Sequence, residues 1–235
     1  MKKGKDIIVA FPLYPGCTLM DFAGATQVFS APFGFKAIWL AAEASITTSD
    51  GVSVLPNYHF DNHPPIDILF IPGGAETGVI NAMQNEPYLQ FLRTTAATAQ
   101  WKGSVCTGAF ILAAAGLLHN CEATTYWSLT PTLALLSEKM KLKVPQDYPR
   151  FLVDRKTKTF TGGGISSSLD LALQLVIEIK GVAVAQETQL FIQYQPKPPV
   201  DSGDPSTAPA ALVQTQREAG ASYAEALADE IRKLL

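Results

Sequence analysis

The chain has 235 residues, of which 47% are apolar and 17% are charged, and its net charge is −3. This composition supports a sizeable buried core and excludes global disorder. Lys and Arg do not form the basic cluster that phosphate binding requires, so we expect no nucleic-acid partner. The sequence contains no run of 18 or more apolar residues, so we expect no membrane-spanning segment.

The cysteines and the first residues of the chain indicate the cellular compartment of the protein. Cys17, Cys106 and Cys121 show no CxxC spacing. The basic first residues precede only a short apolar run, broken by Pro12 and Pro15, which favours a strand over a signal peptide. We therefore expect a reducing, cytoplasmic location without disulfides. The three histidines share no ligand spacing with cysteines or carboxylates, so neither a metal nor another cofactor is expected.

The first half of the chain alternates strand-like and helix-like segments. Short apolar runs bounded by Pro, Gly or polar residues are typical of buried parallel strands. The pair Asp50-Gly51 between β-branched residues indicates a hairpin. The predicted elements are strand 6–11, helix 19–30, strand 35–40, strand 67–71 and helices 76–84 and 87–100.

The second half continues this pattern, with strand 103–106, helices 107–118 and 131–140, strands 151–154 and 158–161 and helix 167–180. Strands alternating with helices imply right-handed βαβ units. We therefore predict an α/β fold, a doubly wound, mostly parallel sheet sandwiched by helices, flavodoxin-like or class I glutamine amidotransferase-like.

The last part of the chain differs in composition. Residues 195–209 are rich in Pro, Ser and Gly, which predicts an extended connector, and residues 210–235 are helical in composition. We expect residues 1–194 to form one α/β domain. Residues 195–235 would then be a connector and a C-terminal helix that packs on the same domain or on a dimer partner.

The segment SVCTG at residues 104–108 places a cysteine where a short strand meets an alanine-rich helix. A nucleophile at such an elbow lies at the carboxyl edge of the sheet, where unpaired N–H groups and the helix dipole would lower the pKa of Cys106. Gly108 would let the first helical turn pack closely. Alternatively, Cys106 is a small buried core residue, because free cysteine is often buried. Spacing alone leaves both interpretations open.

Two further segments follow strands at the same edge. The turn IPGG at residues 71–74 offers glycine N–H groups to a developing anion, unless it is an ordinary βα turn. Asp21 lies among apolar residues after the first strand. It is either a general acid/base whose pKa is raised by burial or a charge near a helix N-terminus. Because ligand sites of open α/β sheets assemble at this edge, the three segments together predict one site.

Several motifs resemble the ThiJ/PfpI superfamily, over nearly the whole chain. They are AFPLYPGCTLMDFAGATQVFS, the IPGG turn, SVCTGAFILAAAGLL, TFTGGGISSSLDLALQL and PPVDSGDPSTAP. Asp21, where many relatives carry Glu, and the C-terminal tail make the chain most similar to the isonitrile hydratase branch.

The resemblance implies roles for individual residues. It assigns the nucleophile to Cys106, the acidic partner to Asp21, and a site-facing N–H and hydroxyl to Thr107. Gly74 matches a second anion-binding N–H. The resemblance also implies a homodimer with the site near the interface. The pocket positions are Gly73, Tyr126, Gly163, Gly164 and Ile165.

One position departs from the family pattern. Related sequences often read ATTHW where this chain reads ATTYW, so Tyr126 replaces a histidine that peptidase-like or glyoxalase-like members use beside their cysteine. His119, near the end of the elbow helix, is interpreted as a surface residue. The departure favours a site built on Cys106 and Asp21 rather than a Cys/His dyad.

The resemblance predicts an enzyme, a lyase that hydrates an isonitrile, a small-molecule substrate, to an N-substituted formamide. Cys106 would form a thioimidate, Asp21 would act as general acid/base, and the amides of Gly74 and Thr107 would stabilise negative charge. Two alternatives stay open. One is a glyoxalase- or deglycase-like enzyme that acts on reactive carbonyls. The other is a non-enzymatic sensor of ligands or redox state with an oxidisable cysteine.

Overall fold

The computed structural model describes residues 5–31 and 33–235. Within these ranges the main sheet has seven strands in the order β5-β2-β1-β6-β7-β9-β8, all parallel to their neighbours except β8. The predicted α/β fold with a mostly parallel sheet is confirmed. The strands are β1 (Ile7–Pro12), β2 (Phe35–Ala41), β5 (Tyr58–His59), β6 (Ile68–Ile71), β7 (Trp101–Val105), β8 (Phe151–Asp154) and β9 (Thr159–Gly162).

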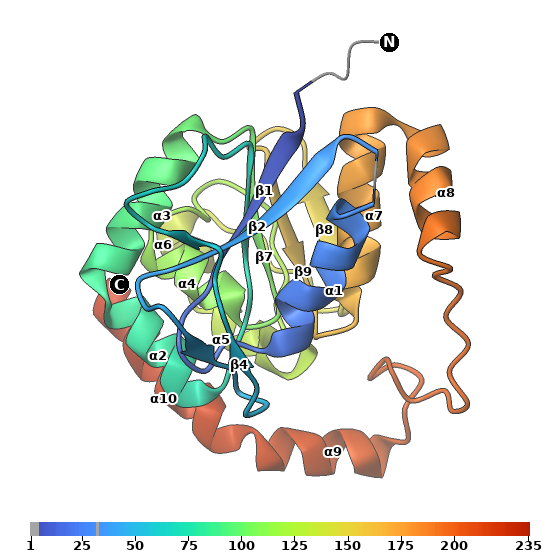
Figure 1. Ribbon diagram of the computed structural model, residues 1–235. Coiled ribbons are helices and arrows are strands. Elements are labelled where there is room, and N and C mark those ends of the chain that lie inside the picture. The colour runs from blue at the N-terminus through green and yellow to red at the C-terminus, as the bar shows by residue number, and fades with distance from the viewer. Residues whose placement is uncertain (1–4, 32) are drawn as a thin grey trace.

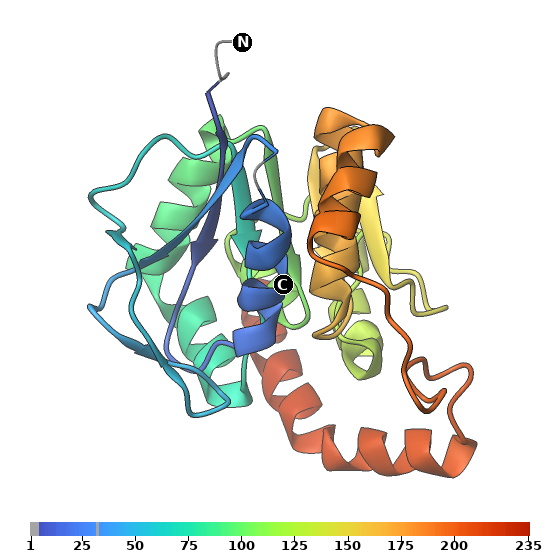
Figure 2. The same ribbon diagram turned by 45° about the vertical axis from the view of Figure 1, so that its right-hand side comes forward.

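Helices cover both faces of this sheet (Figures 1 and 2). On one face α1 packs against α7, and α7 packs against α8; on the other face α2 contacts α3 and α4. The helices are α1 (Leu19–Phe29), α2 (Glu76–Gln84), α3 (Glu86–Thr98), α4 (Gly108–Ala114), α5 (Thr130–Ala134), α6 (Ser137–Met140), α7 (Ser167–Lys180), α8 (Val182–Phe191), α9 (Ala210–Ala219) and α10 (Ala221–Leu234). In the part of the chain that the structure describes, no helix combines the length and apolar character needed to cross a membrane.

Several predicted elements agree closely with the structure. The helices predicted over 19–30 and 167–180 are α1 and α7, and the hairpin at residue 50 pairs β3 (Ile46–Thr47) with β4 (Ser53–Val54). The periodicity of these segments is strong, and their ends carry turn residues. Local signals therefore sufficed here.

Other predicted boundaries were wrong. The helix predicted over 107–118 ends at Ala114, because the chain turns at Gly116, whose φ is 74°. The helix predicted over 131–140 is interrupted between α5 and α6. Helix α8 was not predicted, and the single helix expected over 210–235 is divided at Gly220 into α9 and α10. Glycine is a poor helix former, which explains the division.

Three phenylalanines with tilted rings pack in a row at the centre of the sheet. Phe70 on β6 lies with its ring centroid 5.1 Å from that of Phe11 on β1 and 5.1 Å from that of Phe160 on β9. The Phe160 ring crosses β7 at Gly103, where an added Cβ would lie 2.3 Å from a ring atom. This packing fixes β1, β6 and β7 side by side, so the loops at their carboxyl ends are fixed as well.

The C-terminal arm (residues 195–235) runs below the carboxyl ends of the strands in Figures 1 and 2. Residues 193–209 contain neither helix nor strand, in agreement with the predicted connector. Helix α10 then packs against α2, α4 and α5 and buries Leu227 and Ile231 completely. The arm therefore reaches the loops that follow β6 and β7.

Candidate active site at Cys106

Cys106 lies at the predicted strand-to-helix elbow. β7 ends at Val105 and α4 begins at Gly108. Cys106 has a φ of 54°, in the left-handed region that residues other than glycine seldom adopt. Its N–H donates to the carbonyl oxygen of Gly163 at 2.7 Å, and its own carbonyl accepts the Thr125 hydroxyl at 2.8 Å. Such a conformation costs about 1–3 kcal/mol and persists only where its surroundings enforce it, as these bonds do.

The Cys106 side chain is nearly enclosed, since the residue is 7% exposed. Burial raises the pKa of the thiol well above its ordinary value, and the charge of nearby Asp21 raises it further. The pKa of Cys106 is lowered, to a smaller extent, by hydrogen bonds from the Thr107 N–H, the Thr107 hydroxyl and the Ile165 N–H. The predicted lowering of this pKa is therefore wrong, because desolvation outweighs the surrounding donors. Burial therefore favours the neutral form of the thiol.

Asp21 is the buried carboxyl group whose charge acts on this thiol. α1 carries it into the interior, where it is 0% exposed. Its Oδ2 accepts the Gly73 N–H at 2.8 Å, while Oδ1 has no hydrogen-bond partner among the described residues. Burial raises the pKa of Asp21 to about 8, the Gly73 N–H lowers it, and the charge of Asp50 raises it. This agrees with the first of the two interpretations of Asp21, a carboxyl whose pKa is raised by burial, and it favours the protonated carboxyl at neutral pH.

The turn after β6 packs directly against the elbow. At Gly73, an added Cβ would lie 2.7 Å from the Cβ of Cys106 and 2.7 Å from the backbone nitrogen of Thr107. Only glycine allows the turn and the elbow to approach this closely. Gly73 therefore has two roles in the geometry, because its N–H holds Asp21 and its missing side chain leaves room for Cys106.

Gly74, Thr107 and Tyr223 form a small hydrogen-bonded cluster beside Cys106. The Gly74 N–H donates to Thr107 Oγ1 at 3.0 Å, and the Thr107 hydroxyl lies 3.2 Å from the Gly74 carbonyl oxygen. The Tyr223 hydroxyl, from the first turn of α10, donates to the same carbonyl at 3.2 Å. The Gly74 N–H, expected to bind an anion, is thus already engaged by Thr107.

The remaining predicted pocket residues also lie near the elbow. The Gly163 carbonyl accepts the Cys106 N–H, and the Ile165 N–H interacts with the thiol. The ring of Tyr126 lies over Gly164, where an added Cβ would come within 2.6 Å of the ring. Residues far apart in sequence, at 21, 73–74, 106–107, 126 and 163–165, therefore meet at the carboxyl edge of the sheet.

A small cavity of about 260 Å³ lies beside Tyr126 and Trp127, and residues 202–216 of the C-terminal arm close it. None of the described residues that line it is charged. Arg217 anchors this part of the arm. Its guanidinium lies 5.3 Å from the ring centroid of Trp127 and donates to the Tyr148 hydroxyl at 2.7 Å.

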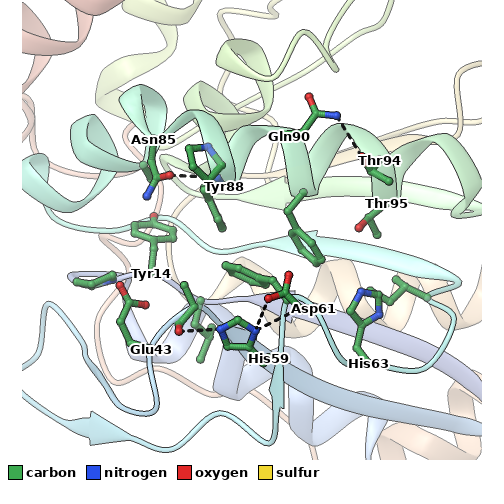
Figure 3. A pocket seen from close by; sticks show the side chains of 18 of the residues that line it. Tyr14, Glu43, His59, Asp61, His63, Asn85, Tyr88, Gln90, Thr94 and Thr95 are labelled. Atoms are coloured by element: carbon green, nitrogen blue, oxygen red, sulfur yellow. Dashed lines mark hydrogen bonds and ion pairs between the residues drawn. The ribbon is translucent and has the colours of Figure 1, made fainter.

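A larger cavity lies elsewhere. It has a volume of about 950 Å³, contains His59 and His63, and includes neither Cys106 nor Asp21 among its lining residues (Figure 3). His119 is exposed beyond the end of α4. The site at the elbow is therefore defined by its chemical groups and not by the size of its cavity.

Sequence reasoning did not identify Tyr223. The residue belongs to an alanine-rich helix, AGASYAEAL, and nothing in that segment marks it as different from a packing aromatic. Its contact with Gly74 spans 149 positions and depends on where the connector places α10. No local signal in the sequence could have revealed this contact.

Comparisons with known proteins agree with this geometry. Residues 8–178 match the DJ-1/PfpI family. The chain is 37% identical over 218 residues to the isonitrile hydratase of Pseudomonas putida, covering 91% of this chain and 90% of the relative. It is 28% identical over 198 residues to the HTH-type transcriptional regulator CdhR of Pseudomonas aeruginosa, covering 81% of this chain and 56% of the regulator.

The fold has a solved counterpart. The crystal structure of a ThiJ/PfpI family protein from Pseudomonas syringae matches with a TM-score of 0.88 and 31% sequence identity, covering 97% of this chain and 91% of that one. The family match extends over most of the chain, and the elbow, the acidic residue and the glycine turn all lie within it. The chain belongs to the DJ-1/PfpI family.

Proposed function

We propose that the protein is a cysteine-dependent enzyme that hydrates an isonitrile, R–N≡C, to an N-substituted formamide. The observation that carries this proposal is the enclosed pair of Cys106 and Asp21, in which the carboxyl has a pKa near 8 and an unpartnered oxygen. The 37% identity to isonitrile hydratase over 91% of the chain supports the choice of substrate class.

In the first step the thiol adds to the terminal carbon of the isonitrile. The Sγ of Cys106 forms a bond to this carbon, and the carboxyl of Asp21 donates a proton to the same carbon. The thiol proton passes to Asp21, so the carboxyl is again protonated. The product is a thioimidate, Cys106–S–CH=N–R. A neutral thiol and a protonated carboxyl are the forms favoured by the two raised pKa values.

In the second step water releases the product. The protonated carboxyl of Asp21 donates its proton to the thioimidate nitrogen, and the resulting carboxylate takes a proton from the water molecule that adds to the thioimidate carbon. The C–S bond then breaks. Asp21 donates a proton to the leaving sulfur and takes up the hydroxyl proton of the intermediate, and the formamide R–NH–CHO leaves. The sum of the two steps is the addition of one water molecule. No group other than the cysteine and the carboxyl has to change its protonation state.

The backbone around the thiol stabilises the charge that develops on sulfur. The N–H groups of Thr107 and Ile165 approach Cys106 and favour its anionic form. Gly74 contributes indirectly, because its N–H donates to the Thr107 hydroxyl. That hydroxyl has one proton and two possible acceptors, the Gly74 carbonyl and the Cys106 sulfur.

Tyr223 acts as a positioning residue in this arrangement. Its hydroxyl donates to the Gly74 carbonyl, the acceptor that the Thr107 hydroxyl also reaches, and so holds the Gly74 turn and Thr107 in place beside Cys106. Burial raises the pKa of the Tyr223 phenol, so it remains a donor at physiological pH. The C-terminal arm also closes the uncharged cavity beside Tyr126, which suits a neutral, apolar substituent R.

The direct test is an assay with p-nitrophenyl isocyanide, in which formation of the formamide is followed. We expect turnover by the wild-type protein and none above background in Cys106→Ala. Cys121→Ala is the matched control, because Cys121 is also buried and has a pKa raised to about 12 but lies outside the site. The absence of turnover in the wild type, or undiminished turnover in Cys106→Ala, would remove the proposal.

The alternatives have less support. Redox-sensing cysteines combine a low pKa with solvent access, whereas Cys106 is enclosed and its pKa is raised. A glyoxalase-like reaction lacks the histidine that Tyr126 replaces. Release of lactate from methylglyoxal by the wild type, but not by Cys106→Ala, would favour this second enzyme class instead.

A further inference from the structure

A long groove lies on the α3 side of the sheet, away from Cys106. It has a volume of about 950 Å³ and runs between α3 and the irregular segment 59–67. On this face the apolar cluster of β1 and β2 packs against Tyr58 on β5, Phe60 and, from α3, Phe91. The groove therefore lies where α3 and the segment after β5 meet over these two strands.

The floor of the groove is a row of aromatic rings. Phe60 and Phe91 are stacked with ring centroids 4.3 Å apart, and Phe60 lies 5.7 Å from Tyr88. The row continues to Tyr14 at one end, 5.8 Å from Tyr88, and to His63 at the other, 5.6 Å from Phe91. Tyr14 and Tyr88 donate their hydroxyls to backbone carbonyls and are fixed in place. The row is thus a rigid apolar surface.

Carboxylates, and no cationic side chains, accompany these rings. Glu43 and Asp61 are exposed at the groove, and none of the described lining residues is a lysine or an arginine. Figure 3 shows Glu43, His59, Asp61 and His63 along one side of the groove and the residues of α3 along the other. A third carboxylate, Asp67, already accepts the Ile8 N–H at 2.8 Å.

His59 lies beside one of the two carboxylates. Its Nε2 is 2.9 Å from the Ala42 carbonyl oxygen, and its Nδ1 is 3.3 Å from both the backbone nitrogen and the Oδ2 of Asp61. Glu43 makes no ion pair among the described residues. Both carboxylates therefore border the groove, Asp61 beside His59 and Glu43 without an ion-pair partner.

We infer that this groove binds a small organic cation with an aromatic or aliphatic body. Aromatic faces attract cations through the ring quadrupole, and adjacent carboxylates add charge complementarity. The volume lies within the range of small-molecule sites, which are lined mainly by apolar groups with a few polar groups that orient the ligand. This site is distinct from that of Cys106 and does not depend on the hydratase proposal.

The test compares three probes of similar shape and different charge: 2-phenylethylammonium, 2-phenylethanol and phenylacetate. Calorimetric titrations are performed on the Cys106→Ala protein, so that chemistry at the elbow cannot contribute heat. We expect saturable binding of the ammonium probe, at least tenfold weaker binding of the alcohol and no measurable binding of the carboxylate. Equal affinity for the three probes, or no saturable binding of the ammonium, would overturn the inference.

Variants of residues that line the groove test whether the ammonium probe binds there. The double variant Glu43→Gln/Asp61→Asn removes both carboxylates at exposed positions, so the fold should be unaffected. We expect it to bind the ammonium probe at least tenfold more weakly. Phe91→Leu should also weaken binding, because it removes one ring face. Glu187→Gln, at an exposed carboxylate on α8, is the matched control and should bind as the parent does. Unchanged affinity in the double variant would place the probe elsewhere and contradict the inference.

Discussion

The hydroxyl of Tyr223 donates a hydrogen bond to the carbonyl oxygen of Gly74 at 3.2 Å, and so joins the C-terminal helix to the turn that follows β6. Gly74 in turn holds the Thr107 hydroxyl through its N–H. Helix α10 is therefore part of the site at Cys106, although the family match ends at residue 178. We therefore expect the C-terminal arm to influence the reactivity of the Cys106 thiol.

Replacing Tyr223 with Phe should lower kcat/KM about three- to tenfold, as expected for the loss of one hydrogen bond of about 0.5–1.5 kcal/mol. Without the phenol, the Gly74 turn loses its hydrogen bond to α10, and the Thr107 hydroxyl is held less firmly beside Cys106. The rate of Cys106 alkylation by iodoacetamide should therefore fall as well. Tyr58→Phe, at a half-buried position on β5, is the control and should change neither rate. A change in KM alone, with normal alkylation, would contradict the positioning role.

Replacing Asp21 with Asn should abolish turnover and change how stability depends on pH. The pKa of Asp21 rises from 3.8 to about 8 on folding, so the folded state holds a proton that the unfolded state releases. The wild type should therefore lose stability, relative to the variant, as pH rises from about 4 to about 8, with a slope approaching 1.4 kcal/mol per pH unit. Urea unfolding at several pH values measures this difference. A difference that stays constant with pH would show that the carboxyl is not desolvated.

Replacing Gly73 with Ala should disturb the elbow. The added methyl would lie 2.7 Å from both the Cβ of Cys106 and the nitrogen of Thr107, so backbone has to move. We expect a loss of about 1–3 kcal/mol in unfolding free energy, typical of overpacking, and a strong loss of activity. Gly203→Ala is the control for stability, since nothing lies within 4 Å of an added Cβ there. Wild-type stability in Gly73→Ala would mean that the turn and the elbow are not in contact.

The sequence was sufficient to predict the parts of the fold that depend on local patterns. The apolar runs of β1, β2 and β6 and the period of α7 specify their elements almost without reference to the rest of the chain. The elbow at Cys106 was also predictable, because a short strand leads directly into an alanine-rich helix, whereas the sequence left two interpretations open for Asp21.

Properties that depend on the sum of many contacts were not predictable. The pKa of Cys106 was expected to fall, because the N–H groups at an elbow are visible in the sequence while the depth of burial is not. Tyr223 could not be found, because its place depends on the path of the connector. The engagement of the Gly74 N–H by Thr107 required the distance between two turns.

The pH dependence of catalysis tests the assignment of Asp21 as the proton donor. If the protonated carboxyl is the active form, kcat/KM should be constant at neutral pH and fall above about 8, the pKa to which burial raises Asp21. The charge of Asp50 contributes to that rise, so Asp50→Asn should lower the pKa of Asp21 and move the alkaline limb to lower pH. Asparagine keeps an oxygen that can accept the Leu19 N–H, now bonded to Asp50 Oδ2 at 2.9 Å, so helix α1 should stay in place. A limb that does not move, or that moves to higher pH, would mean that another group titrates.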